Sequence, residues 1–342
     1  MRRELQVNVG GSSLPGAPPS TRLLDDAGMR VCLMIEGQED VTWQHWLALA
    51  AACERGGFEG LFRSDHYLSV FGSEQRESLD AWATLAGLAA RTERIRLGTL
   101  VSPVTFRHPS VLAKSVATVD HISGGRVELG LGAGWNEREH AAFGFPFPEL
   151  AARMELLAEQ LELAVRQWTE DNVSFAGRHH SLDGLTANPK PLQQPRPPLI
   201  LGGRAGRRSL ALAVRFADEY NVIFATPEEC AEFRGRVESA CEQAGREPLR
   251  FSLMTACVVG SDRADLVKRA RGRLEVTGEK ADPERYVRER AGGKVLGTVD
   301  EVVEQLHAYE KAGVDRVFLQ HLAHHDIEMV ELIAAEVLPA LG

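Results

Sequence analysis

From Arg30 onward, short runs of β-branched and apolar residues alternate with longer stretches whose apolar residues recur at helical spacing. This alternation is typical of βα units, in which a helix packs back on a parallel sheet after each strand. Eight such pairs can be counted. The expected strands are Arg30–Ile35, Gly60–Ser64, Ile95–Val101, Arg126–Leu131, Pro198–Leu201, Glu219–Phe224, Arg250–Val258 and Arg316–Gln320.

The stretches between the strands predict helices, and several carry residues that start or stop a helix. Thr226-Pro227 opens one helix, and Gly56-Gly57 follows the end of another. The expected helices are Trp43–Gly56, Leu79–Ala90, Val111–Ile122, Ala151–Trp168, Arg208–Phe216, Pro227–Ala244, Ala264–Leu274 and Val299–Ala312.

Eight consecutive βα units predict a (β/α)8 TIM barrel. An open doubly wound sheet would more often carry a glycine-rich dinucleotide turn after its first strand, whereas here that strand runs into Glu36-Gly37-Gln38. Two interruptions are interpreted as insertions after strands 4 and 7 that shape substrate access. They are Asp171–Thr186, with a β-hairpin across Ala176–Arg178, and the charged stretch Thr277–Lys294.

The first 28 residues are rich in Gly, Pro and Ser and lack a periodic apolar pattern. We therefore expect residues 1–28 to form a flexible N-terminal extension and residues 29–342 to form a single barrel domain. With 342 residues and 44% hydrophobic content, the chain is large enough to bury one sizeable core.

The composition limits the cellular location and the binding partners that we expect for this chain. No apolar run approaches the roughly 18 residues that cross a bilayer, and the first residues show no signal-peptide pattern. The five cysteines are scattered without a C-x-x-C pair, which favours reduced thiols. A net charge of -9 argues against nucleic-acid binding. We expect a cytoplasmic protein that holds any anionic ligand locally.

Polar residues just past the carboxyl ends of barrel strands face the reaction chamber. Glu36 follows the first strand, Asp65 and His66 follow the second, and Ser102 follows the third. An imidazole beside a carboxylate is suited to proton transfer or to hydrogen-bonding a reduced ring. The residues alone leave open that Asp65 caps a turn and that His66 packs as a neutral core residue.

A glycine-rich turn runs from the fifth strand into a helix as Gly202-Gly203-Arg204-Ala-Gly206-Arg207. This arrangement aims backbone N–H groups and a helix dipole at a phosphate, and the arginines add positive charge. A tight connection that binds nothing would also favour glycine.

After the fourth strand, Gly132-Ala-Gly134-Trp135-Asn136-Glu137 resembles a dinucleotide fingerprint only superficially, because its spacing and its place in the chain differ. Its glycines would let the backbone approach a flat cofactor, with Trp135, Glu137 and His140 lining the pocket. A packing role for Trp135 is the alternative.

Histidine pairs such as His179-His180 and His324-His325 do not predict a metal site. Neighbouring side chains of a strand point apart, and the chain has no H-E-x-x-H motif. We interpret these residues and His321 as solvated loop histidines and expect no metal.

Several segments carry the residues of one known family: Gly57–His66, Arg94–Pro103, Arg107–Pro109, Thr118–Asn136, Asn188–Pro191, Gly202-Gly203 and Gly297-Thr298. On these motifs the chain resembles the luciferase-like monooxygenase superfamily, especially its coenzyme F420-dependent branch, from Arg30 to Leu341. The resemblance implies a bacterial luciferase-like barrel with flavin or deazaflavin across its mouth, usually as a homodimer.

The resemblance also implies where the cofactor lies. The ring would sit near Asp65, His66 and the end of the third strand, where relatives often carry a non-prolyl cis peptide, here at Leu100-Val101 or Val101-Ser102. The phosphate would meet Gly202 and Gly203. The implied cofactor-binding residues are Asp65, Leu100, Val101, Ser102, Gly132, Gly134, Asn136, Gly202, Gly203, Arg204 and Arg207.

The implied reaction is hydride transfer between C5 of a deazaflavin, or N5 of a flavin, and a small organic substrate. The candidate catalytic residues for proton delivery are His66 and Glu36, followed by Glu137. Trp135 stands where some sugar-phosphate dehydrogenase relatives place a carboxylate, which argues against transferring their substrate to this chain.

Three alternatives stay open. The nearest is a two-component FMN-dependent monooxygenase that receives reduced flavin from a separate reductase. An electropositive groove for the acidic tail of F420, suggested by Arg63, Arg107, His108 and Lys114, places F420 ahead of FMN. A non-catalytic flavin- or deazaflavin-binding barrel would lack the acid–base residues. A phosphosugar isomerase or aldolase would use an interior lysine or carboxylate, and the expected strands contain no lysine.

Overall fold

The computed structural model describes residues 28–72, 75–289 and 293–342. The extension expected over residues 1–28 lies outside this part of the chain, apart from Gly28. Within the described ranges, no helix combines the length and the apolar character needed to span a membrane.

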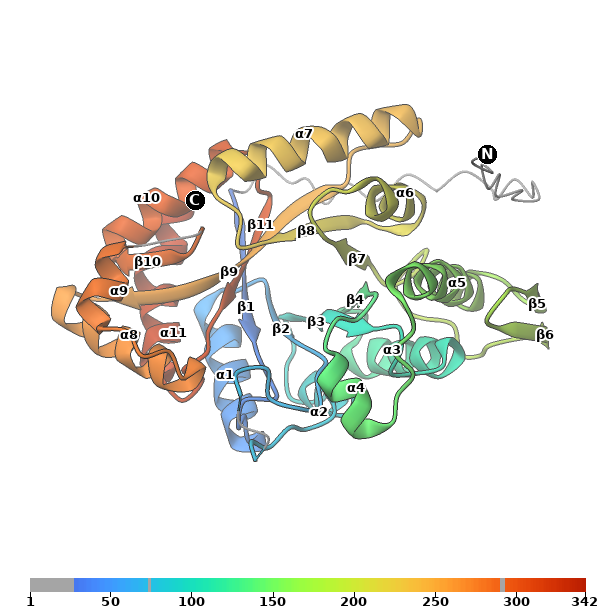
Figure 1. Ribbon diagram of the computed structural model, residues 1–342, viewed down its shortest axis with the longest axis horizontal. Helices are drawn as coiled ribbons and strands as arrows, with labels where there is room; N and C mark the ends of the chain where they lie inside the picture. The colour runs from blue at the N-terminus through green and yellow to red at the C-terminus, as the bar shows by residue number, and fades with distance from the viewer. Residues whose placement is uncertain (1–27, 73–74, 290–292) are drawn as a thin grey trace.

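In the described part of the chain, eight parallel strands close into a barrel, which confirms the predicted fold (Figure 1). Neighbours pair in the order β1, β2, β3, β4, β7, β8, β9 and β11, and β11 pairs back with β1. A short strand β10 runs parallel to the end of β9. The strands are β1 (Arg30–Ile35), β2 (Gly60–Arg63), β3 (Arg96–Pro103), β4 (Val127–Gly132), β7 (Leu199–Gly202), β8 (Glu219–Ile223), β9 (Arg250–Gly260), β10 (Val295–Thr298) and β11 (Arg316–Gln320).

Each predicted helix is present, and local signals set its ends. At the start of α1, the Thr42 side chain accepts the His45 N–H while the His45 ring accepts the Thr42 N–H. Gly57 ends α1 at φ +84°, a left-handed conformation that favours glycine. The main helices are α1 (Trp43–Gly56), α2 (Ala81–Ala89), α3 (Pro109–Ser123), α5 (Leu150–Thr169), α6 (Arg207–Phe216), α7 (Pro227–Gln243), α8 (Arg263–Thr277) and α10 (Val299–Lys311).

Both expected insertions carry structure of their own. The first contains the predicted hairpin, formed by antiparallel strands β5 (Val173–Ala176) and β6 (Ser181–Leu185), which project beyond α5 (Figure 1). The second contains α9 (Pro283–Glu289). A helix absent from the prediction, α4 (Glu137–Phe143), follows β4, and α11 (Ile327–Leu332) follows β11.

The barrel interior is a packed apolar core rather than a channel. Phe62 and Phe318 meet edge to face with their ring centroids 4.9 Å apart. Gly60 and Gly98 leave room for Phe62, since a Cβ on either would lie within 2.8 Å or 2.5 Å of that ring. The interior cluster consists of Cys32, Met34, Phe62, Leu100, Ile200, Met254 and Phe318, with Val101 packed against it.

Charged residues fill the amino-terminal end of the barrel. Arg316, fully buried at the start of β11, donates to Glu128 at 2.7 Å and also pairs with Glu219. Arg96 pairs with Glu128, and Arg250 lies 3.6 Å from Glu219. Burial opposes charge on Glu128, but Arg316 and Arg96 hold its pKa well below the usual range. The charges at this end therefore neutralise one another.

Candidate active site

The ends of β2 and β3 are joined by hydrogen bonds. Fully buried Asp65 accepts at Oδ2 from Ser102 Oγ and from Arg107 Nη1, both at 2.6 Å. Arg107 also donates to the Tyr67 hydroxyl at 2.8 Å and to Asp80 at 2.6 Å. Burial opposes the charge of Arg107, but Asp65 and Asp80 raise its pKa. Asp65 Oδ1 has no hydrogen-bond partner within the described chain.

The expectation of an electropositive groove is wrong for Arg63 and Arg107. Arg63 is fully buried, donates to the carbonyls of Ser64 and Leu79, and lies 5.0 Å from the Trp46 ring. Burial lowers its pKa to about 10. Since Arg107 is neutralised by two carboxylates, neither residue offers a free charge to an acidic tail.

His66, at the end of β2, is held by a carboxylate that the sequence analysis missed. Its Nδ1 lies 2.7 Å from Oε2 of Glu139, which is fully buried in the first turn of α4. Burial alone would lower the pKa of His66, but the hydrogen bond and charge of Glu139 raise it. Trp135 meets the imidazole edge to face at 5.6 Å and is itself 65% exposed.

The loop from β4 to α4 places its predicted residues differently. Asn136 is buried and its Oδ1 caps α4, accepting from the Glu139 N–H at 3.4 Å. Glu137 is exposed, whereas Glu139 is the carboxylate that holds His66. His140 is buried, with Nε2 2.6 Å from Thr105 Oγ1, so it does not line a pocket.

The sequence contains a signal for Glu139, although it points to a different contact. The spacing Asn136-x-x-Glu139 matches a capping box, in which the second side chain returns to the N–H of the cap. The structure instead sends the Glu139 carboxylate to His66 and to the backbone N–H groups of Tyr67 and Leu68.

The end of β3 carries the irregularity that the resemblance implied. The peptide bond between Leu100 and Val101 is cis, and the β3–β4 register shifts between Thr99 and Ser102. Val101 lies over β4, where a Cβ on Gly132 would come within 2.7 Å of it. Gly134 follows with φ +78°. A backbone bulge and glycines thus meet at the mouth of the barrel.

Glu36, just after β1, is fixed by two side-chain amides. Its oxygens accept from Gln320 Nε2 at 2.7 Å and from Gln38 Nε2 at 2.9 Å, and Gln38 in turn accepts from Ser64 Oγ at 2.6 Å. Gln320 Oε1 is buried and lacks a partner among the described residues. Gln320 was not predicted from the sequence, although this residue ends the inward-facing row of Arg316, Phe318 and Gln320 on β11.

The Gly202-Gly203 turn is exposed, and the geometry fits a phosphate. A Cβ on Gly202 would lie 2.8 Å from the Asn221 carbonyl oxygen, and Gly203 adopts φ +149°. α6 starts after Gly206 with no side-chain cap among the described residues, and Arg207 is exposed in its first turn. The Gly203 N–H already donates to the Asn221 carbonyl at 3.1 Å, so an anion would meet the N–H groups in the first turn of α6 and the charge of Arg207.

Arg204, the other predicted helper, is already engaged. Its Nη2 donates to Glu229 at 3.1 Å, and its guanidinium lies 5.3 Å from the Phe233 ring. Exposed Arg207 is therefore better placed than Arg204 to contact a phosphate at this turn.

Histidine side chains also follow β11. His321 is buried, with Nε2 3.1 Å from the Asp326 carbonyl, and burial lowers its pKa to about 3. Burial likewise lowers the pKa of His324 to about 4. His321 and His324 are therefore buried, and the expectation that they are solvated loop residues is wrong. Over the described ranges, no three His, Cys, Asp or Glu side chains are arranged to hold a metal ion.

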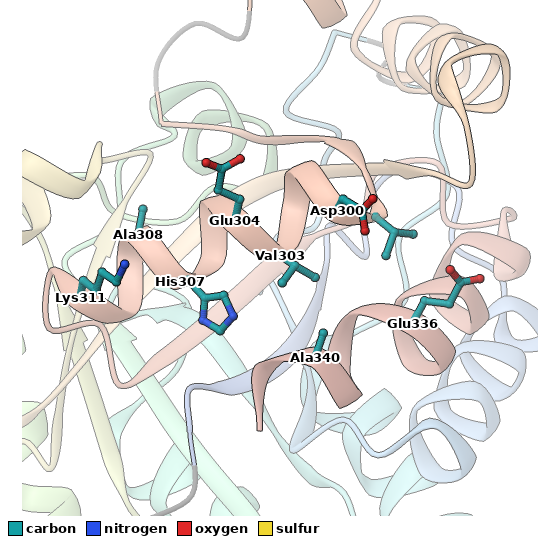
Figure 2. Close-up of a pocket in the computed structure, with 9 residues that line it drawn as sticks. Asp300, Val303, Glu304, His307, Ala308, Lys311, Glu336 and Ala340 are labelled. Carbon is teal, nitrogen blue, oxygen red and sulfur yellow. The ribbon is translucent and has the colours of Figure 1, made fainter.

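A surface groove of about 560 Å³ lies on the outside of the barrel (Figure 2). It separates α10 from the turns at the carboxyl terminus. Its lining includes Asp300, Glu304, His307, Lys311, Glu336 and Ala340. None of the predicted site residues lines it, so this groove is not the site built at the strand ends.

Comparison with known proteins shows the family to which the chain belongs. The family model described as luciferase-like monooxygenase matches residues 29–316. The chain belongs to this family. As a luciferase-like protein it is an oxidoreductase that acts on a small molecule with a flavin or a deazaflavin.

Relatives of this luciferase-like protein use both cofactors. It is 27% identical to an FMNH2-dependent dimethylsulfone monooxygenase of Pseudomonas putida, over 85% of this chain and 86% of that protein. It is 30% identical to an F420-dependent hydroxymycolic acid dehydrogenase of Mycobacterium tuberculosis, over 75% of this chain and 69% of that protein. A monooxygenase from Streptomyces bottropensis shares the fold at a TM-score of 0.77 and 24% identity, covering 92% of this chain and all of that one (100%).

Proposed function

We propose that this protein uses coenzyme F420 to move a hydride between the deazaflavin and a small organic substrate at the mouth of the barrel. The observation that carries the proposal is the His66 imidazole, which is held by buried Glu139 beside exposed Trp135. Hydride exchange between an alcohol and a carbonyl requires a proton to move as well. Histidine is the side chain best suited to move one near neutral pH.

The strand ends offer a place for both halves of the cofactor. The N–H groups at the start of α6 would hold the phosphate, beside the Gly202-Gly203 turn and with Arg207 adding charge. The Leu100-Val101 bulge and Gly132 would support the ring. When bound, the deazaflavin would supply the carbon that accepts or releases the hydride.

The chain's own residues would manage the proton and the substrate. His66 would give or take the substrate proton, and the nearby negative charge of Glu36 favours its protonated form. The Trp135 ring would form one wall for an apolar part of the substrate. Exposed Glu137 has no part in this scheme.

The second candidate is an FMN-dependent monooxygenase served by a separate reductase. The relative from Pseudomonas putida, matched over 85% of this chain, favours it. Because Arg63 and Arg107 are not free charges, they do not favour the acidic tail of F420 over FMN. The 30% identity to the F420-dependent dehydrogenase and the acid–base pair at His66 are our reasons for proposing F420 before FMN. Homodimer formation and the need for a reductase stay predictions.

Parallel titration of the purified protein with F420 and with FMN tests the choice of cofactor. Binding is read from the quenching of cofactor fluorescence. We expect saturable binding of F420 and weaker binding of FMN. Tight binding of FMN with no response to F420 would replace the proposal by the monooxygenase, and no binding of either would overturn both.

A further inference from the structure

We propose that Glu139 is a positioning residue that orients the His66 imidazole and makes Nε2 the ring atom that exchanges the proton with the substrate. The inference deepens the proposed function, on which the identity of the reaction rests.

The contacts of Glu139 determine which ring nitrogen carries a hydrogen. Its Oε1 accepts the backbone N–H groups of Tyr67 and of Leu68, the latter at 3.2 Å, and its Oε2 lies 2.7 Å from His66 Nδ1. Burial disfavours the ionised carboxylate, but these hydrogen bonds lower the pKa of Glu139 below its ordinary value. An ionised carboxylate only accepts hydrogen bonds, so Nδ1 must carry the hydrogen.

The chemistry of His66 follows from that tautomer. With the hydrogen held on Nδ1, neutral His66 presents a lone pair on Nε2 and can act as a base. Once protonated, it presents an N–H at the same atom and can act as an acid. Trp135 packs edge to face against the ring at an interplanar angle of 75° and limits its rotation.

Other charged groups near His66 are Glu36 and Asp65, which also favour its protonated form. Neither has a hydrogen bond to the ring in the described structure: Glu36 accepts from two amides, and Asp65 accepts from Ser102 and Arg107. Glu139 therefore supplies the direct contact that sets the orientation of His66.

A matched control is Glu39, which lies between β1 and α1 and also contacts the loop after β2. Buried Glu39 accepts from Ser69 Oγ at 2.7 Å and from the Val70 N–H at 2.8 Å, and it pairs with Arg76. Two carboxylates thus hold consecutive halves of the loop after β2. Glu139 contacts His66, and Glu39 contacts the residues that follow.

The experiment is nitrogen-15 NMR of labelled histidine in the cofactor-free protein across a pH titration, with His66 assigned by comparison with His66→Gln. In the unaltered protein we expect a raised pKa for His66 and a neutral form with the hydrogen on Nδ1. In Glu139→Gln the new carbonyl can accept from Tyr67 and Leu68, which turns its NH2 toward the ring. We then expect a lower pKa and a neutral form protonated on Nε2.

Glu39→Gln is the control for loop stability and should leave the pKa and tautomer of His66 unchanged. With F420 and substrate, Glu139→Gln should lose on the order of 10²-fold in kcat, the scale of acid–base catalysis. The acid limb of its pH profile should move to lower pH.

Two results would overturn the role of Glu139: an Nε2-protonated neutral His66 in the unaltered protein, or an unchanged His66 pKa in Glu139→Gln. The first measurement does not use Glu139→Gln, so it decides the question even if that variant does not fold. The expected NMR result in a protein that neither binds nor uses F420 would refute the proposed function while leaving the pair of side chains supported.

Discussion

The amino-terminal end of the barrel holds arginine and glutamate side chains that pair with one another, whereas the carboxyl-terminal end also holds two buried oxygen atoms that have no hydrogen-bond partner among the described residues. Buried Arg316 contacts Glu128 and Glu219. At the other end, Asp65 Oδ1 and Gln320 Oε1 are buried without partners in the described chain. Buried polar groups are costly unless they are paired. The difference fits the proposed function, in which one end stabilises the barrel and the other binds the cofactor and substrate.

The largest effect should come from breaking the paired end. Arg316→Met would leave Glu128 and Glu219 buried with a lost partner, and we expect it to lower the free energy of unfolding by about 3–5 kcal/mol. Urea unfolding measures this change. The control is Arg178→Met, which removes an exposed pair with Glu155 and should cost less than about 1 kcal/mol. Equal losses in the two variants would contradict the assignment of stability to this end.

The next effect should appear at the open end and in catalysis rather than stability. His66→Gln removes the proposed proton carrier, and kcat with F420 should fall by about 10²–10⁴-fold. The melting temperature should stay close to that of the unaltered protein, because the side chain is not part of the apolar core. A variant that turns over normally would remove His66 from the mechanism.

A smaller effect should follow from filling the phosphate turn. A Cβ at residue 202 would lie 2.8 Å from the Asn221 carbonyl oxygen, so Gly202→Ala must shift the turn. We expect cofactor affinity to weaken about tenfold, measured by fluorescence titration. Gly235→Ala, inside α7 where a Cβ meets open space, is the matched control and should leave affinity unchanged. Unchanged affinity in Gly202→Ala would place the phosphate elsewhere.

The smallest effect should come from the charge beside that turn. Arg207→Gln should weaken cofactor binding a few-fold at low salt, with the difference shrinking as ionic strength rises. Arg204→Gln should weaken binding less, because Arg204 is paired with Glu229. The reverse order in the same titration would show that Arg204 leaves its partner to hold the ligand.

Most of the architecture could be predicted from the sequence because elements that bury one face have apolar residues at regular spacing. Each strand and helix buries a face, and those faces produced the spacings that predicted all eight βα units. The glycine turn at Gly202-Gly203 was visible for a similar reason, since a strand, glycines and a helix start lie together in the chain.

The site was harder to predict because its contacts join distant residues. The direction of the first turn of α4 decides between exposed Glu137 and buried Glu139, and the local Asn136-x-x-Glu139 spacing indicates a helix cap rather than a contact with His66. The sequence suggested that Arg63 and Arg107 are free positive charges, yet Arg63 donates to backbone carbonyls and Arg107 pairs with Asp65. Asp65 lies 42 residues from Arg107 in the chain, so no local sequence pattern could predict this pair.

The most direct test of the proposed cofactor site is a crystal structure of the protein with F420 bound. We expect the phosphate at the start of α6 beside Gly202 and Gly203, and the ring between the Leu100-Val101 bulge and His66. A deazaflavin bound elsewhere, such as in the outer groove along α10 (Figure 2), would contradict it.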